Sequence, residues 1–85
     1  MVNAVTQQQL DNTLSLFDKY GNEEIDFGEL LGAINDQAAL ILSKQKLINF
    51  TVTEMVSGRF RIRATATDAL SPLGKQRITE IKRAQ

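Results

Sequence analysis

The sequence predicts a small α+β domain that has helices first, then a basic β-hairpin, and then a short C-terminal helix. Apolar residues recur at helical spacing within residues 6–46 and again after Pro72. Between these regions, residues 48–66 alternate apolar and polar side chains with the period of a half-buried strand. Because the chain has 85 residues, a single domain over residues 1–85 is expected.

The first helix is expected over residues 6–20. Thr6 and Gln9 have the spacing of a capping box, in which each side chain satisfies a free backbone N–H of the other residue. Leu10, Leu14 and Phe17 then recur on one helical face, and Gly21-Asn22 supplies a stop signal.

Residues 26–46 form either one helix or a helix-turn-helix. Asp26 is a favoured N-cap residue. Asn35-Asp36 could end this helix and cap another, whereas apolar residues at helical spacing continue as far as Lys46. The sequence leaves both alternatives open. In either case the first part is expected to bury four apolar residues, namely Phe27, Leu30, Leu31 and Ile34.

The apolar triplet Leu40-Ile41-Leu42 covers about 200° of helical arc. One interpretation is a central helix that is buried on all sides. The other is a contact between two copies of the chain, which a thin core would favour. A homodimer is therefore one expected state.

The hairpin is expected over residues 48–66, with Ser57-Gly58 as its tight turn. A period of two places Arg59, Arg61 and Arg63 on one face and the neighbouring apolar residues on the core face. Guanidinium groups about 6.6–7 Å apart match the repeat of phosphates along nucleic acid. The competing interpretation is a solvated edge strand whose charges prevent aggregation.

The last helix is expected over residues 71–84. Ser71 is a favoured N-cap, and Pro72 suits the first helical position, where its missing N–H costs nothing. Its apolar stripe is expected to consist of Leu73, Ile78 and Ile81.

Composition excludes several kinds of site. The chain has no Cys and no His, which excludes thiol chemistry, disulfides and zinc sites built on these residues. No nucleophile or base is paired with the carboxylates of residues 18–36, so we expect no enzymatic activity and no cofactor. No apolar run approaches the ~20 residues of a membrane span, and no signal peptide is visible, so a cytoplasmic location is expected.

The zero net charge hides two oppositely charged halves. Residues 1–43 hold one basic and seven acidic side chains, a net charge of −6, and residues 44–85 hold nine basic and three acidic side chains, a net charge of +6. Such a chain can orient on a polyanion or dock onto an oppositely charged partner.

Residues 18–29 resemble an EF-hand calcium loop. Two positions do not match that loop. Tyr20 stands where a calcium ligand belongs, and Glu23 stands where the loop requires glycine. Helix capping accounts for the same residues, so no metal site is expected. The positions that match calcium ligands are Asp18, Asn22, Asp26 and Glu29.

From about Leu10 to Lys82 the order of elements resembles a winged helix-turn-helix domain of the bacterial and archaeal transcription-regulator type. Residues 24–34 resemble the second helix of such domains, and Ala69-Leu-Ser-Pro-Leu-Gly-Lys75 resembles the passage from wing to C-terminal helix. The resemblance implies binding of double-stranded DNA, with a recognition helix in the major groove and the wing on the backbone. It assigns these roles to Gln37, Ser43, Lys44 and Lys46 of the helix and to Arg59, Arg61 and Arg63 of the wing.

Two functions are therefore expected. The first is a DNA-binding protein that regulates transcription by occupying a site, and such a protein should lose affinity steeply with salt. The second is a protein-interaction module, such as an adaptor, an inhibitor or a subunit of a complex, that docks through its charge-split surface. Such a module should expose an apolar patch near the charge.

Overall fold

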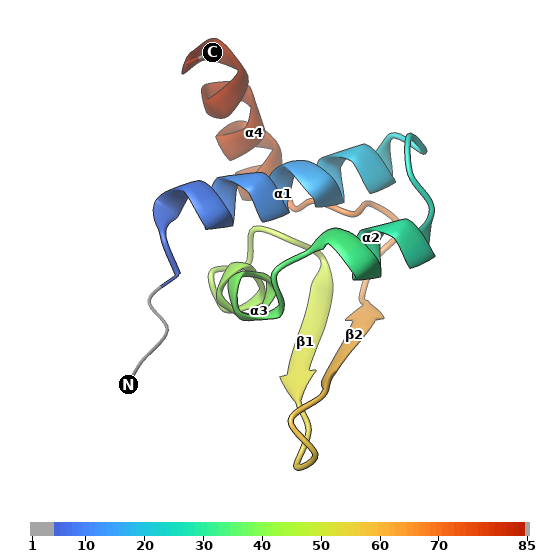
Figure 1. Ribbon diagram of the computed structural model, residues 1–85. Helices are drawn as coiled ribbons and strands as arrows, with labels where there is room; N and C mark the ends of the chain where they lie inside the picture. Colours follow the sequence, from blue (N-terminus) through green and yellow to red (C-terminus); the bar gives the residue numbers. More distant parts are fainter. Residues whose placement is uncertain (1–4, 85) are drawn as a thin grey trace.

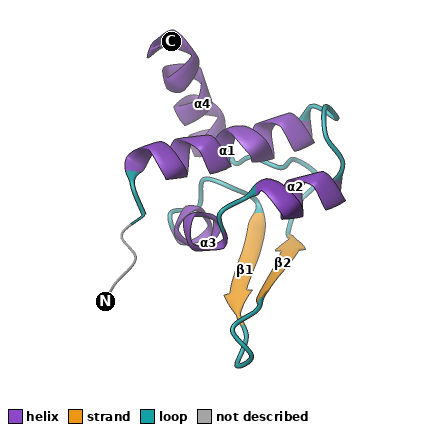
Figure 2. Cartoon of the chain, in the orientation of Figure 1, coloured by secondary structure: helices purple, strands orange, loops and turns teal. Residues whose placement is uncertain are grey.

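The computed structural model describes residues 5–84, which form four helices and one antiparallel hairpin (Figures 1 and 2). This arrangement confirms the predicted α+β class. No helix within these residues has the length and apolar character needed to cross a membrane. The elements in chain order are α1 (Gln7–Gly21), α2 (Phe27–Ala33), α3 (Asp36–Lys44), β1 (Phe50–Glu54), β2 (Phe60–Ala64) and α4 (Pro72–Ala84).

The first helix, α1, begins with the predicted capping box. The Thr6 hydroxyl accepts a hydrogen bond from the Gln9 backbone N–H at 3.1 Å, and the Gln9 side-chain oxygen accepts one from the Thr6 N–H at 2.9 Å. These local bonds satisfy backbone donors that lack a partner within the helix.

The segment after α1 is a helix-turn-helix, so the alternative of one continuous helix over residues 26–46 is wrong. Asp26 caps α2, because its side chain accepts a hydrogen bond from the Glu29 N–H at 2.7 Å. Ile34 and Asn35 then leave the helical region, with ψ angles of 153° and 116°. The Asn35 side chain starts α3 by accepting a hydrogen bond from the Ala38 N–H at 3.1 Å. The turn is short, and α3 ends at Lys44.

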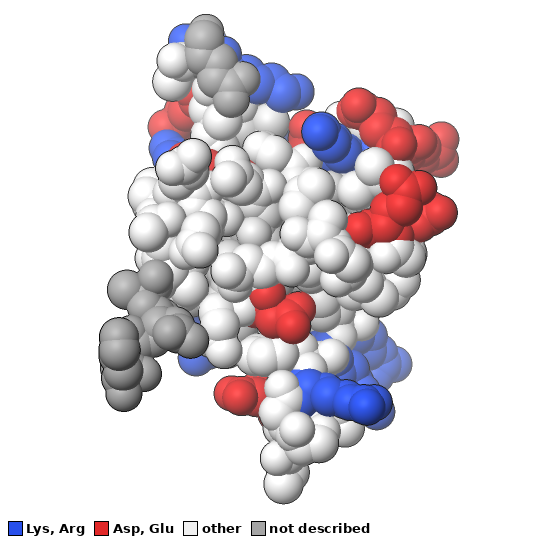
Figure 3. Space-filling model, in the orientation of Figure 1, with Lys and Arg blue, Asp and Glu red and all other residues white. Residues whose placement is uncertain are grey.

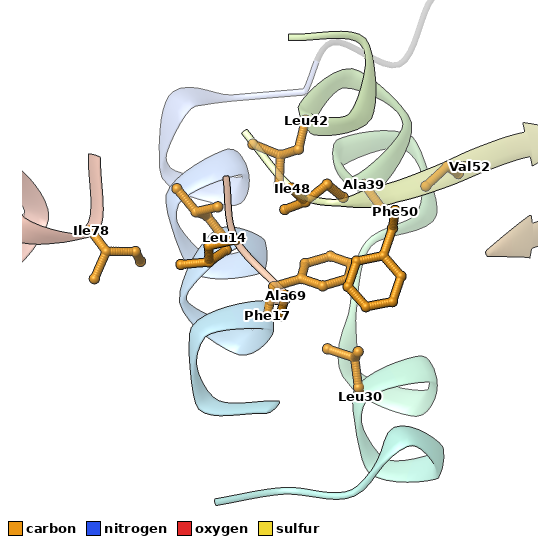
Figure 4. Packing of buried hydrophobic residues seen from close by; sticks show 11 residues of the cluster. Leu14, Phe17, Leu30, Ala39, Leu42, Ile48, Phe50, Val52, Ala69 and Ile78 are labelled. Atoms are coloured by element: carbon orange, nitrogen blue, oxygen red, sulfur yellow. The ribbon is translucent and has the colours of Figure 1, made fainter. Parts of the chain in front are cut away.

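The core lies where α1, α2, α3 and β1 meet (Figure 4). Phe17 of α1 is completely buried and lies against Phe50 of β1, with 5.0 Å between the ring centroids. Leu30 of α2 points toward this aromatic pair (Figure 4). The cluster comprises Leu14, Phe17, Leu30, Ala39, Leu42, Ile48, Phe50, Val52, Ala69, Leu70 and Ile78.

Some apolar residues predicted to be buried are instead exposed. Phe27 and Leu31 of α2 are exposed, because this helix has only seven residues and buries Leu30 alone. In α4, Leu73 is 57% exposed, since Gly74 and Ile78 face the rest of the fold. In α3, Leu42 is buried and its two apolar neighbours are half-buried, so most of that triplet belongs to the core.

The hairpin is shorter than predicted, and its turn is longer. Strands β1 and β2 pair from Phe50 opposite Ala64 to Glu54 opposite Phe60. The tight turn predicted at Ser57-Gly58 is present, and it also includes Val56. The Met55 N–H bonds to the Arg59 carbonyl at 2.7 Å and the Gly58 N–H bonds to the Met55 carbonyl at 2.9 Å, which closes a three-residue loop over residues 56–58. Gly58 has φ +85°, which favours glycine.

The segment before β1 pairs with the segment that leads into α4. Ile48 pairs with Leu70 rather than with β2, which is why the hairpin does not extend over residues 48–66 as predicted. Ser71 caps α4 as predicted, because its hydroxyl accepts a hydrogen bond from the Gly74 N–H at 3.1 Å. Gly74 lies directly against the carbonyl of Leu47, so α4 packs closely on this segment.

Two helices end with a residue that is not glycine in the left-handed region. Glu23 follows α1 and Lys46 follows α3, and both have φ 62°. After α1, the Glu24 N–H bonds to the Lys19 carbonyl and the Glu23 N–H bonds to the Tyr20 carbonyl, which is a Schellman motif. Glycine is the usual residue at this position, because a side chain is strained there.

Replacing Glu23 by glycine is expected to raise the free energy of unfolding by about 0.5–1 kcal/mol, because it removes left-handed strain. Glu24→Gly is the control, since it removes the same charge at a neighbouring residue that does not have a positive φ. This control should lower stability by a similar amount through backbone entropy. Urea denaturation monitored by circular dichroism measures both changes, and equal effects would contradict the assignment of strain to Glu23.

Candidate nucleic-acid interface

The outer face of the hairpin carries a row of basic and hydroxyl side chains. Arg61 lies opposite Thr53, and Arg63 lies opposite Thr51. All four are exposed, while Phe50 and Val52, at the alternate positions of β1, are buried in the core. This alternation confirms the prediction that arginines and core residues occupy opposite faces of β2.

The third arginine, Arg59, lies just before β2, at the base of the loop. Its carbonyl accepts the hydrogen bond that closes the loop, and its side chain is exposed. With the strand period of two, Arg59 continues the row of Arg61 and Arg63 toward the tip of the hairpin.

A shallow hollow of about 460 Å³ lies on this face. Its walls combine guanidinium and hydroxyl groups with apolar atoms from the tip of the hairpin. Guanidinium and hydroxyl groups are the donors that proteins use most for phosphate oxygens. The hollow is lined by Thr51, Thr53, Glu54, Met55, Val56, Arg61 and Arg63.

Most basic residues of α4 are paired with carboxylates of the chain instead. Arg77 forms a bidentate pair with Asp11 of α1, with N–O distances of 2.9–3.2 Å. Lys82 lies 3.5 Å from Asp18, which is also on α1. These pairs join the acidic first half of the chain to the basic second half, so part of the charge split serves to dock α4 onto α1.

The hairpin arginines have no such partners. None of the ion pairs found in residues 5–84 includes Arg59, Arg61 or Arg63. Their charges are therefore free to meet an external anion. Figure 3 shows Lys and Arg side chains gathered beside the hairpin, whereas Asp and Glu side chains gather where α1 turns into α2.

The acidic corner between α1 and α2 holds a larger hollow, of about 600 Å³. Two of the side chains that matched a calcium loop serve other roles here, since Asp26 caps α2 and Asp18 pairs with Lys82. Within residues 5–84, no group of three or more carboxylates is arranged to hold a metal ion. The acidic residues that line the hollow are Glu23, Glu24, Asp26 and Glu29.

The residues assigned to the recognition helix differ in how freely they can act. Gln37 and Lys44 of α3 are exposed. The Ser43 hydroxyl donates a hydrogen bond to the Phe50 carbonyl at 2.8 Å, so it joins α3 to β1 within the fold. Lys46 follows α3 with an exposed side chain, and its carbonyl accepts a hydrogen bond from the Ser71 hydroxyl at 2.6 Å.

The predicted site residues thus lie on two surfaces. The buried face of β1 packs on the side of α3, because Ala39 and Leu42 share the core with Phe50 and Val52. The arginine row lies on the opposite face of the hairpin, turned away from the helices. The structure brings Arg61 and Arg63 together with two threonines, and it leaves the exposed side chains of α3 on a separate surface.

Four residues of this interface were not singled out from the sequence. Thr51 and Thr53 show the alternation expected of an exposed strand face, which is a usable signal once the register is known. Met55 and Val56 are exposed apolar residues next to the turn. Their signal is the pairing of two apolar residues with a glycine-containing loop, where polar residues are usual.

Comparisons with protein-family models, with curated proteins and with solved structures found no match to this chain.

Proposed function

We propose that this chain binds DNA, holds its phosphate backbone with the arginine row of the hairpin, and regulates transcription by occupying its site. The observation that carries the proposal is the contrast between two sets of basic residues. Three of the four basic residues of α4, namely Lys75, Arg77 and Lys82, are paired with carboxylates, whereas Arg59, Arg61 and Arg63 are exposed and all absent from the ion pairs of residues 5–84. Exposed arginines without internal partners are suited to external phosphates.

The geometry of a strand supports the use of all three arginines together. Side chains two residues apart project from the same face about 6.6–7 Å apart. Successive phosphates of one DNA strand have a similar spacing, so the row can follow the backbone. The hydroxyls of Thr51 and Thr53, directly across the hairpin, add neutral donors to the same surface.

The helix-turn-helix adds a second surface to the proposal. Of the α3 residues assigned to DNA contact from the sequence, Gln37 and Lys44 have exposed side chains. Ser43 is not available for such a contact, because its hydroxyl donates a hydrogen bond to the Phe50 carbonyl. Two polar side chains offer few base contacts. Contact with the DNA backbone therefore dominates the proposed affinity. We propose in addition that the protein is cytoplasmic and acts as a homodimer.

The test is fluorescence anisotropy of a labelled duplex titrated with the protein at several salt concentrations. Arg59→Ala/Arg61→Ala/Arg63→Ala is expected to weaken binding at least about tenfold at low salt and to make the salt dependence shallower by about 2–3 units of log–log slope. Circular dichroism should show that the variant remains folded, since all three side chains are exposed.

A matched control removes the same charge from α4. Lys75→Ala/Lys82→Ala/Arg83→Ala replaces three exposed basic residues away from the hairpin. This variant should keep most of the salt slope of the unchanged protein. Equal loss in both triple variants would show that net charge, rather than the hairpin, drives binding. An absence of binding even at low salt would refute the proposal.

A second function, protein interaction, is favoured by one observation. Met55 and Val56 are exposed beside the arginine row, which is the apolar patch near charge that a docking surface requires. Under this alternative the arginines meet an acidic protein surface. Two results together would favour this alternative. The unchanged protein would not bind the duplex, and it would capture a protein partner that neither the arginine variant nor a Met55→Gln/Val56→Ser variant captures.

A further inference from the structure

The hairpin projects from the domain (Figure 1). Two exposed apolar residues, Met55 and Val56, lie at its tip. Val56 is fully exposed, and Met55 is 42% exposed. Val56 lies in the loop over residues 56–58, and Met55 precedes it and forms the two backbone hydrogen bonds that close the loop. The left-handed glycine, Gly58, ends this loop. Neither residue is part of the core cluster, so their apolar character does not stabilise the fold.

The arginine row leads directly to this tip. Arg63, Arg61 and Arg59 follow one another toward the loop on the outer face. The acidic residue nearest the tip, Glu54, pairs with Phe60 at an alternate position of β1, and it also lines the hollow with Arg61 and Arg63. Because the arginines lie on one face of the hairpin, phosphates are expected to approach along that face. A DNA strand held by the arginines therefore passes beside the two apolar side chains.

The size of the tip indicates which groove it can enter. The two strands of a hairpin lie about 4.8 Å apart, and the minor groove of B-DNA is about 6 Å wide. A hairpin that carries side chains on both faces cannot enter this groove deeply unless the groove widens. The tip residues alone can reach the floor, where apolar side chains act by inserting between base pairs.

On this geometry, we infer that Met55 and Val56 form a wedge that enters the minor groove, partly unstacks one base step and bends the DNA. The inference rests on the proposed function, because the arginine row must hold the backbone beside the wedge. It assigns a preference to the flexible pyrimidine–purine steps, which are the easiest to unstack. Specificity would then come from deformability of the duplex in addition to contacts by α3.

The experiment measures energy transfer between dyes at the two ends of a short duplex. One duplex carries a central TA step, and another carries a stiff A-tract. The unchanged protein is expected to increase transfer and to bind the TA duplex more tightly. Met55→Gln/Val56→Ser is expected to remove the increase and to weaken binding to the TA duplex about tenfold, with the salt slope unchanged.

Leu73→Gln is the matched control, since it replaces an exposed apolar residue on α4, far from the tip (Figure 1). This control should bend DNA like the unchanged protein. If the unchanged protein binds without bending, or if the tip variant bends DNA equally, the wedge is refuted while the proposed function stands. If the arginine variant binds as well as the unchanged protein, the proposed function fails together with the wedge.

Discussion

Replacing Phe17 by alanine is expected to lower the free energy of unfolding by about 3–5 kcal/mol. Phe17 is completely buried, and its ring contacts the ring of Phe50 at a centroid distance of 5.0 Å. Removing it leaves a cavity at the junction of α1, α2 and β1, because Leu30 closes the same space from α2 (Figure 4). Urea denaturation followed by circular dichroism measures the loss.

The effect is large for a domain of this size. A domain of 85 residues is expected to have about 4–13 kcal/mol of total stability, so this one substitution removes a large share of it. The aromatic pair also joins the first helix to the hairpin, and its contact contributes beyond simple burial. We therefore expect the hairpin and the helices to lose structure in one transition.

Phe27→Ala provides the control, because it deletes the same atoms from an exposed position on α2. Phe27 touches only the rim of the core, with its ring 5.7 Å from that of Tyr20. Its loss should cost about 1 kcal/mol. If the two variants were equally stable, Phe17 would not occupy the central position that the structure gives it.

Replacing Gly74 by alanine is expected to destabilise the protein by about 2–3 kcal/mol. A Cβ atom at this position would clash with the carbonyl oxygen of Leu47. That oxygen belongs to the backbone and accepts a hydrogen bond from the Ser71 N–H, so it cannot move aside freely. The start of α4 must therefore shift away from the segment between α3 and β1.

The matched control is Gly32→Ala in α2, where no atom lies within 4 Å of the added Cβ. Because alanine favours a helix more than glycine does, this variant should gain about 0.5–1 kcal/mol. Opposite signs for the two glycine substitutions, measured as shifts of the denaturation midpoint, are the expected result. A gain in both variants would contradict the close approach of α4.

The charge split serves two purposes in the structure. Asp11 and Asp18 of α1 pair with Arg77 and Lys82 of α4, so these charges stabilise the fold. The charges of the hairpin remain available for a partner. The net charge of each half does not distinguish the paired basic residues of α4 from the unpaired arginines of the hairpin, because both groups lie in the basic half of the chain.

Features that depend on near neighbours in the chain could be predicted from the sequence alone. The capping of α1, α2 and α4 was predicted correctly, because each cap is a hydrogen bond between residues three apart. The opposite faces of β2 also follow from the sequence, since the period of two is a property of the strand itself. The α+β class follows from these local patterns taken together.

Features that depend on residues distant in the chain could not be predicted without the packing of the whole domain. The helical period allowed one helix over residues 26–46, yet Leu30 and Leu42 must reach the same core from different directions, and this requires the break at Ile34 and Asn35. The exposure of Leu73 follows from the approach of Gly74 to Leu47, and the pairing of Arg77 joins residues 66 positions apart. Periodicity describes a helix or strand by itself, whereas packing against partners that are remote in sequence decides which of its side chains become buried.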